Sequence, residues 1–449
     1  MNIIWNISIC VSAFVVVLIT RWWYRWSNPK CNGKLPPGSM GFPIIGETLA
    51  FFKSHGFYET SPFLEKRMSR LDAQTKLFEQ YIICKRFKSS CERFRYGSLF
   101  KTNIFGSNTV VVTDHDVMYE ILKQENKAFM FSLPDGFFKV FGKDKELVDH
   151  GKTHKHVKQI TLNFLGTEGL KWKLIKDMDR ATGEDLKSKA TLGSLDIKET
   201  VSNARKSAMN VIRDVLLSRK ESEEKHEDIL NTMRKDVIFD DQAVVDNVFA
   251  IPVAAKDTTS TIGSMAVKYI TNNHKVFLEL KKEHDAILQN RVDKNSGVSW
   301  EEYKNNMTFT NMVINETLRL ANVTPVLFRK ALKDVEIKGY TIPKGWMVVV
   351  ASSLIHYDPA IYENPYEFNP WRWEGKELVH GSRTFMVFGG GLRLCPGAEF
   401  ARLQIAIFIH HLVTNYEFSM EQDCEITRTP LVSFPNGINL NISHATPTS

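Results

Sequence analysis

The segment FGGGLRLCPG (388–397) is the most informative stretch of this sequence. Its three consecutive glycines free the backbone for a tight turn or for a close approach to a flat or anionic group. Cys395 follows Arg393 by two residues, and a predicted helix begins shortly after Gly397. A thiolate near a helix N-terminus gains from the helix dipole and from unpaired N–H groups, which lower its pKa. The segment therefore suits a metal-ligating cysteine whose electronics are tuned by N–H bonds to the sulfur.

Two other interpretations of this segment are a glycine-rich turn that buries a structural cysteine and a phosphate-binding loop. The sequence excludes the phosphate loop, because no strand, loop and helix with Gly-Lys-Ser or Gly-Lys-Thr occurs here. Five spaced positions favour the metal site over the plain turn: Phe388, Gly391, Arg393, Cys395 and Gly397.

The N-terminus predicts a membrane anchor. Residues 3–20 contain no charged side chain, and eighteen helical residues rise about 27 Å, which is close to the thickness of a bilayer core. The following RWWYRW (21–26) suits the lipid–water interface. A cleaved signal peptide, the alternative, would need a basic start and a small-residue cleavage site, and the segment has neither.

Domain boundaries follow from this anchor. Residues 1–26 form the predicted anchor with its interfacial flank, and the proline-rich segment 27–46 is a hinge, since its adjacent prolines cannot continue a helix. Residues 47–449 are expected to form one domain. Positive charge after the anchor predicts a single-pass protein with a cytosolic body.

The composition limits the possible partners and the cellular compartment of the protein. The formal net charge is +7, which suits a membrane surface, an acidic protein or nucleic acid. No nucleic-acid partner is expected, because no binding motif is present and basic residues are mixed with acidic ones along the chain. Six cysteines without a C-x-x-C pair indicate reduced thiols in a cytosolic compartment.

Hydrophobic periodicity predicts a mixed chain in which helices dominate. Two short strands are expected in 98–113 and further strands in 335–352. The predicted helices are 114–126, 150–189, 200–235, one long and mostly buried helix at 240–272, 308–320 and 398–411.

The segment around Cys395 resembles the cysteine-ligand loop of the cytochrome P450 superfamily, F-x-x-G-x-R-x-C-x-G. Two further motifs match in the family's order. Glu316 and Arg319 lie three residues apart on a predicted helix, and FNPWRW (368–373) supplies Arg372. A lone Glu–Arg pair at this spacing is usually a solvated salt bridge. The resemblance implies instead a buried ion-pair cluster of the three side chains.

The segment AAKDTT (254–259) matches a third family motif, with Ala255 where the family has glycine. The resemblance implies a haem whose iron has an axial thiolate, Cys395, and a catalytic pair, Asp257 and Thr258, that delivers protons for O–O cleavage. An incidental Asp-Thr-Thr on a helix is the alternative. Pro252 lacks an N–H for the helix and is expected to kink or loosen it.

The carboxylate groups of a haem need cationic or donor partners. The resemblance implies Arg393 and Arg329 as two of them. His154 and Lys158 occupy the place of the family's Trp-x-x-x-Arg and keep a donor and a cation at that spacing. A surface helix rich in lysine and histidine would have the same pattern.

The resemblance covers nearly the whole chain and is strongest to a plant branch that contains triterpene and steroid hydroxylases. It implies a mainly α (α+β) cytochrome P450 fold with buried haem, small sheets and an anchor in the endoplasmic reticulum membrane. It also implies a monooxygenase that hydroxylates a large apolar terpenoid or sterol, with a triterpene favoured. The expected partners are an NADPH-dependent flavoprotein reductase, whose acidic face would meet a basic surface, a small apolar substrate and membrane lipid.

Two segments depart from the family pattern. An apparent insertion covers 71–95, and an apparent deficit falls within 198–220, where the family has helices that roof the substrate pocket. The deficit favours an alternative function, a haem-binding but catalytically impaired protein. A haem-dependent isomerase or dehydratase without dioxygen is a third possibility, against which Asp257 and Thr258 argue.

Overall fold

The computed structural model of this protein describes residues 2–43, 45–59, 61–68, 96–133, 152–192, 201–221, 226–293, 296–376, 378–379, 381–429 and 431–445. The chain divides into two compact units. Unit 1 comprises Met1–His55, Glu59–Val140 and Val326–Leu354, and unit 2 comprises Gly56–Tyr58, Phe141–Pro325 and Ile355–Ser449. The apparent insertion at 71–95 lies outside the described residues.

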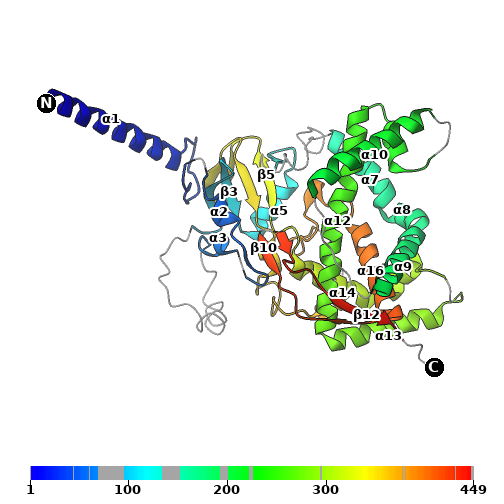
Figure 1. Cartoon of the computed structure of the whole chain (residues 1–449). Coiled ribbons are helices and arrows are strands. Elements are labelled where there is room, and N and C mark those ends of the chain that lie inside the picture. Colours follow the sequence, from blue (N-terminus) through cyan, green and yellow to red (C-terminus); the bar gives the residue numbers. More distant parts are fainter. Residues whose placement is uncertain are drawn as a thin grey trace. The chain divides into compact units, whose positions relative to one another are not determined.

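Unit 1 begins with helix α1 (Asn2–Ser27), which extends away from the sheet of this unit (Figure 1). Within the described residues it is the one helix long and apolar enough to cross a membrane, over Ile9–Ser27, where its mean hydropathy is 1.2. The helix does not stop at residue 20. The Trp- and Arg-rich segment predicted as an interfacial flank is therefore helical too.

A five-stranded sheet forms the body of unit 1, in the order β2-β3-β8-β5-β4. β3 and β8 pair in parallel and the other neighbours are antiparallel. β-Branched side chains fill its centre, and Val110, Val111 and Val112 have no exposed surface. The predicted strand pair in 98–113 is confirmed, with a turn at Phe105 and Gly106, whose φ angles are both positive. The strands are β2 (Leu99–Ile104), β3 (Ser107–Val112), β4 (Phe129–Phe131), β5 (Leu327–Ala331) and β8 (Met347–Val350).

Short elements complete unit 1. The carboxylate of Asp114 accepts a hydrogen bond from the Val117 backbone N–H at 3.0 Å and so caps the predicted helix α5. The proline-rich segment lies against the strands, since Lys101 N donates to Pro37 O at 2.8 Å. The remaining elements are α2 (Thr48–Phe51), β1 (His55–Gly56, at the boundary between the units), α3 (Pro62–Glu65), α5 (His115–Lys123), β6 (Val335–Ile337) and β7 (Tyr340–Ile342).

Unit 2 is mainly helical. Its first helices are α7 (Lys152–Leu165), α8 (Thr167–Gly169), the π-helix η1 (Leu170–Leu174), α9 (Ile175–Leu192), α10 (Val201–Glu221) and α11 (Ile229–Arg234). They are followed by α12 (Asp241–Asn272), α13 (His274–Asn290), the π-helix η2 (Glu302–Asn306), α14 (Thr308–Ala321), α15 (Ser353–His356, at the boundary between the units), the 3-10 helices η3 (Pro370–Trp373) and η4 (Gly391–Arg393), and α16 (Ala398–Asn415). Four strands not predicted from the sequence end the unit: β9 (Tyr416–Met420), β10 (Thr427–Thr429), β11 (Leu431–Ser433) and β12 (Leu440–His444).

Helix α12 passes through unit 2 beside α16 and α14 (Figure 1). Its first residue follows Asp240, whose carboxylate accepts from Ala243 N at 2.8 Å. Buried residues occur near both ends of the helix, but none of residues 248–261 is buried. The expectation of a mostly buried helix is therefore wrong for its middle. Pro252 lies inside the helix without ending it.

Candidate active site around Cys395

The loop before α16 wraps the backbone around Cys395. The N–H of Cys395 donates to the carbonyl of Phe388 at 3.0 Å, which closes the loop, and Leu394 N donates to Gly391 O at 3.1 Å. Gly389 and Gly391 have φ angles of 79° and 64°. Residues with a Cβ atom rarely adopt this left-handed conformation, so glycine is needed at both positions. Gly397 then precedes the first residue of α16.

The thiol of Cys395 is accessible, although protein atoms surround it closely enough to withdraw much of its water. This burial raises the pKa of the Cys395 thiol above its ordinary value. The backbone N–H of Gly397, which hydrogen-bonds to the sulfur, and the Lys158 cation both lower it. The predicted lowering of the pKa is therefore wrong for the free thiol, because the cost of desolvation exceeds these two favourable interactions.

Lys158 on α7 reaches the cysteine loop. Its Nζ donates to the carbonyl of Leu392 at 3.0 Å. Burial and the neighbouring Arg393 lower the pKa of Lys158, while Cys395 raises it. The structure thus brings Lys158, Arg393 and Cys395 together, three of the residues predicted to bind the cofactor. His154 lies one turn earlier on α7 and is partly exposed.

Arg329 belongs to unit 1 and sits on β5. Its Nε lies 2.8 Å from Oε2 of Glu125, and the two side chains are almost fully buried. Nη1 of Arg329 donates to the carbonyl of Phe328 at 2.8 Å. The predicted cofactor partner therefore has a carboxylate partner of its own.

Asp257 and Thr258 lie on the exposed middle of α12. Oγ1 of Thr258 donates to the carbonyl of Ala254, one turn earlier, at 2.7 Å. That bond uses the hydroxyl proton, whereas the oxygen can still accept a hydrogen bond from another group. Helix α12 contacts α16, the helix that begins three residues after Cys395.

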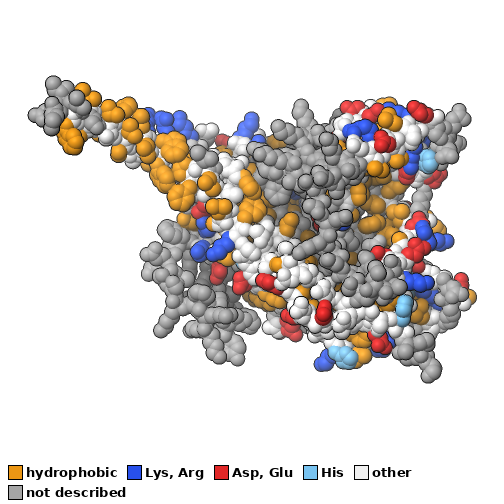
Figure 2. All heavy atoms as spheres, in the orientation of Figure 1, with side chains coloured by type: hydrophobic (Ala, Val, Ile, Leu, Met, Phe, Trp, Pro, Cys, Tyr) orange, Lys and Arg blue, Asp and Glu red, His pale blue; other side chains and the backbone are white. Residues whose placement is uncertain are grey.

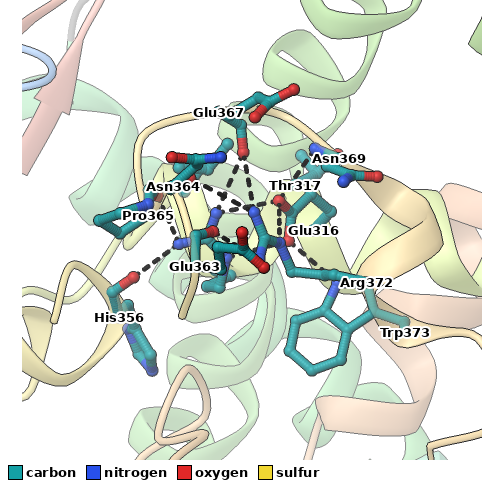
Figure 3. A network of polar contacts seen from close by, with 12 residues as sticks. Glu316, Thr317, His356, Glu363, Asn364, Pro365, Glu367, Asn369, Arg372 and Trp373 are labelled. Carbon is teal, nitrogen blue, oxygen red and sulfur yellow. Dashed lines mark hydrogen bonds and ion pairs between the residues drawn. The ribbon is translucent and has the colours of Figure 1, made fainter. Parts of the chain in front are cut away.

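Glu316, Arg319 and Arg372 form one buried polar network (Figure 3). Nε and Nη2 of Arg319 each lie 2.9 Å from one carboxylate oxygen of Glu316, and neither side chain has exposed surface. Nε of Arg372 lies 2.8 Å from Oε1 of Glu316, and Trp373 Nε1 donates to Oε2 at 3.0 Å. The carboxylate also accepts from Asn369 N at 3.0 Å. Glu316 is therefore paired with two cations and fully hydrogen-bonded, as a buried charge requires.

His356 connects this network to the cysteine loop and was not predicted as a site residue. Its carbonyl accepts from Nη1 of Arg319 at 2.6 Å, and its ring Nε2 accepts from the Met386 backbone N–H at 3.0 Å. The carbonyl of Met386 in turn accepts from Gly389 N at 2.9 Å, at the start of the glycine run. No sequence pattern marks a histidine for this position, since the groups that it joins lie far apart in the chain.

Arg428 is a second site-supporting residue that sequence analysis missed. It is buried without a carboxylate partner among the described residues and donates to backbone carbonyls. Its acceptors include Leu320, Ala321 and Asn322, the last residues of α14 and its cap. Carbonyls at a helix C-terminus lack helical partners, so the guanidinium stabilises the end of the helix that carries Glu316.

Comparison with known proteins places these features in a family. A family model described as cytochrome P450 matches residues 196–441. The chain is 50% identical to cytochrome P450 708A2 of Arabidopsis thaliana, covering 99% of this chain and 100% of the relative. It is 31% identical to the beta-amyrin 16-alpha-hydroxylase of Maesa lanceolata, covering 98% and 99%. The fold is similar to that of retinoic acid-bound cyanobacterial CYP120A1, with a TM-score of 0.73 and 19% identity over 92% of this chain and 100% of that one.

The residues around Cys395 fit a haem iron. They provide one accessible sulfur ligand that accepts an N–H bond from Gly397. Lys158 and Arg393 lie close to this loop, and their positive charges are compatible with an anionic cofactor. The family match covers more than half of the chain and the plant relatives match over nearly all of it. The chain therefore belongs to the cytochrome P450 family, as a haem-thiolate monooxygenase of the plant branch that includes triterpene and steroid hydroxylases.

Proposed function

We propose that this enzyme hydroxylates a large apolar terpenoid or sterol, with a triterpene favoured, at the membrane of the endoplasmic reticulum. The observation that carries the proposal is the accessible Cys395 thiol within its glycine loop, in a chain 50% identical to a plant cytochrome P450. The name of a second relative specifies hydroxylation of beta-amyrin, a large polycyclic alcohol, and supports this substrate class. An apolar substrate of this class also suits the middle of α12, where Val253 and Ala254 carry apolar side chains next to the proposed catalytic pair.

Cys395 is the proposed axial ligand. A bound haem would supply activation of dioxygen, with a thiolate ligand donating electron density to favour O–O cleavage. The role of the protein itself is to position the sulfur atom of Cys395. Gly397 donates its N–H to Sγ, and the bond between Cys395 N and Phe388 O fixes the loop. Phe388 and Gly391 belong to the same proposed cofactor site, since they shape the loop on its N-terminal side.

Lys158 and Arg393 are the proposed partners of the haem carboxylates. Both lie at the cysteine loop, and the Lys158 ammonium is already oriented by its bond to Leu392 O. His154 and Arg329 remain proposed partners. For Arg329 this role requires that one guanidinium serve both Glu125 and the cofactor, which its five N–H donors permit.

Asp257 and Thr258 are the proposed proton-delivery pair. Thr258 can accept a hydrogen bond from a water molecule on the exposed face of α12, because its own proton is directed to Ala254 O. Asp257 is exposed beside it and can exchange protons with solvent. A hydroxyl and a carboxylate one residue apart can thus guide protons from bulk water to the face of the helix that meets the pocket.

The proposed location rests on α1, whose apolar stretch Ile9–Ser27 contains no buried residue. Helix α1 would cross the membrane once, with the remaining chain in the cytosol. An NADPH-dependent flavoprotein reductase is the proposed electron donor, and its acidic face would meet basic residues such as Lys158 near the cysteine loop. The proposed location is tested by carbonate extraction and protease protection in plant microsomes, where the body should be membrane-bound and accessible from the cytosolic side.

One experiment tests the ligand and the reaction together. Reduced protein with carbon monoxide should show the red-shifted Soret band of a thiolate-ligated haem, and Cys395→Ala should abolish that band. Cys424→Ala is the matched control and should retain it, since Cys424 lies outside the loop. With reductase, NADPH and a panel of triterpene alcohols and sterols, the wild type should add one oxygen atom to a substrate. A normal band in Cys395→Ala would refute the ligand assignment.

A second candidate function is a haem-binding protein with impaired catalysis. The alignment with the Arabidopsis relative runs over 501 positions, more than the 449 residues of this chain, so the relative carries segments without a counterpart here. If those segments cover the substrate pocket in the relative, the pocket of this chain would stay wetter and release hydrogen peroxide. The carbon monoxide band would then be normal while no member of the panel is hydroxylated.

A further inference from the structure

A cavity of about 550 Å³ opens in unit 1 where the C-terminal end of α1 meets the five-stranded sheet. Arg25 and Trp26 from α1 form one side. The turn between β2 and β3 and the segment after β4 contribute polar groups and Leu133. Lys330 of β5, Lys344 and the buried Trp346 form the other side. All residues that line the cavity belong to unit 1, whereas the cysteine loop belongs to unit 2.

Three cations line this cavity and no Asp or Glu does: Arg25, Lys330 and Lys344. Among the described residues, none of their side chains forms an ion pair. The nearby Asp334 is occupied with other groups, because it accepts the backbone N–H of Lys344 at 2.7 Å and the amide of Asn32 at 3.4 Å. A concave site with three unneutralised cations attracts a compact anion.

The apolar part of the lining points to a ligand that is more than an inorganic ion. Trp26 is partly exposed at the cavity, and its Nε1 donates to Gly41 O at 3.2 Å, which ties the end of α1 to the following segment. Trp346 is only 7% exposed and forms a fixed apolar wall. Indole rings beside cations are the combination found where a protein meets the glycerol and phosphate region of a bilayer.

The position of the cavity along α1 indicates that the anion is the headgroup of a membrane lipid. The apolar stretch of α1 ends at Ser27, so Arg25 and Trp26 lie at the level where it leaves the hydrocarbon core. Lys and Arg side chains gather beside this end of the helix, next to its apolar surface (Figure 2). Lipid phosphates are concentrated at that depth.

We infer that this cavity binds the phosphate headgroup of an anionic membrane lipid through Arg25, Lys330 and Lys344. The inference rests on the proposed membrane anchoring by α1 and adds a specific lipid site to it. A phosphomonoester lipid such as phosphatidic acid fits best, since its exposed phosphate can contact all three cations while its glycerol lies against the indole rings. A bound lipid would hold the sheet of unit 1 at the membrane surface.

The test uses the full-length, haem-loaded protein in a neutral detergent. Short-chain phosphatidic acid is titrated and its affinity measured, with phosphatidylcholine of the same chain length and inorganic phosphate as parallel titrants. Saturable binding of phosphatidic acid, at least tenfold tighter than either comparator, is expected. Equal affinity for inorganic phosphate would overturn the lipid assignment, and equal affinity for phosphatidylcholine would overturn the role of the three cations.

Matched substitutions locate the site. Lys330→Gln and Lys344→Gln should each weaken phosphatidic acid binding about fivefold, the effect of roughly 1 kcal/mol for one cation near a lipid surface. Lys333→Gln removes the same charge from an exposed neighbour outside the cavity and should leave affinity unchanged. An equal loss in Lys333→Gln would show general charge attraction and overturn the site. Because the titration is done in detergent, it is independent of carbonate extraction, which tests anchoring itself.

Discussion

The ring of His356 accepts a hydrogen bond from the backbone N–H of Met386 at 3.0 Å, with both residues almost completely buried. The other ring nitrogen, Nδ1, lies 3.3 Å from Oδ1 of Asn322. Since Nε2 must accept, Nδ1 carries the proton and donates to Asn322. The histidine thus joins the end of α14 to the segment that leads into the cysteine loop.

His356→Phe should destabilise this segment, because it leaves the buried N–H of Met386 without an acceptor, at a cost of about 1–3 kcal/mol. We expect a lower thermal midpoint and a reduced fraction of haem in the thiolate-ligated form, measured from the carbon monoxide spectrum. His356→Gln keeps an acceptor in the side chain and should recover part of both. If phenylalanine and glutamine variants behave alike, the hydrogen bond to Met386 does not position the loop.

Glu316→Gln should have a larger effect. The substitution leaves the guanidinium groups of Arg319, which has no exposed surface, and of Arg372, which is 9% exposed, without their carboxylate. Breaking one side of a buried ion pair typically costs 3–5 kcal/mol, so we expect little haem-loaded protein at 25 °C. Haem content and thermal midpoint are the measurements. The control is Glu363→Gln, an exposed side chain in the same region, and an equally small effect of both changes would contradict the prediction.

Sequence patterns predicted the parts of the site that depend on side-chain spacing. The resemblance to family motifs implied the loop from Phe388 to Gly397, the pair Glu316 and Arg319, and Lys158, and the structure places Lys158 at the cysteine loop. The helix that follows Asp114 was predicted too, and its capping residue can be read from the sequence because it is adjacent to the helix that it stabilises.

The features that the sequence could not predict are contacts with groups that no sequence motif marks. His356 and Arg428 bind mainly backbone groups that are distant in the chain, and every residue has a backbone. The unburied middle of α12 was missed for a related reason. Apolar periodicity shows that a helix has an apolar face. It does not show whether other parts of the protein cover that face at every turn of the helix.

A buried histidine pair in unit 2 predicts acid sensitivity. Nδ1 of His284 lies 2.9 Å from Nδ1 of His410. Burial, with a smaller effect of Arg291, lowers the pKa of His284 to about 3. Burial, with smaller effects of His284, Arg291 and His411, lowers that of His410 to about 2. Both rings are therefore neutral in the folded protein, and a proton on either would have to enter a site with a neighbouring cation.

Because the folded-state pKa values lie below the unfolded value of about 6.5, the stability is complete above pH 6.5 and declines as the pH falls. Between pH 7.5 and 5.5 each histidine should remove about 1.4 kcal/mol from the free energy of unfolding. Denaturant unfolding at the two pH values measures this loss. His410→Gln should reduce it by about half, whereas His274→Gln at an exposed position should not. An unchanged pH dependence in His410→Gln would exclude the pair as its source.

Thr258→Ala tests the role of α12 in proton delivery. The wild-type hydroxyl donates to Ala254 O at 2.7 Å and can accept a bond from water on the exposed side of the helix. Alanine removes that acceptor without adding bulk, so haem binding and the carbon monoxide band should be retained. Coupling should fall, and we expect a several-fold rise in the hydrogen peroxide formed per NADPH consumed. General acid–base groups typically contribute 10²- to 10⁴-fold to a rate, so product formation should drop at least tenfold.

The control for Thr258 is Ser260→Ala. Its hydroxyl makes the same kind of bond, to Lys256 O at 2.7 Å, but two residues further along a helix it points about 200° away around the axis. A general loosening of α12 would affect both variants, whereas impaired proton delivery should affect Thr258→Ala alone. Peroxide and product are measured in the same reaction with purified reductase. Equal coupling in the wild type and Thr258→Ala would reject the proposed role, and equal uncoupling in Ser260→Ala would assign the effect to the helix backbone.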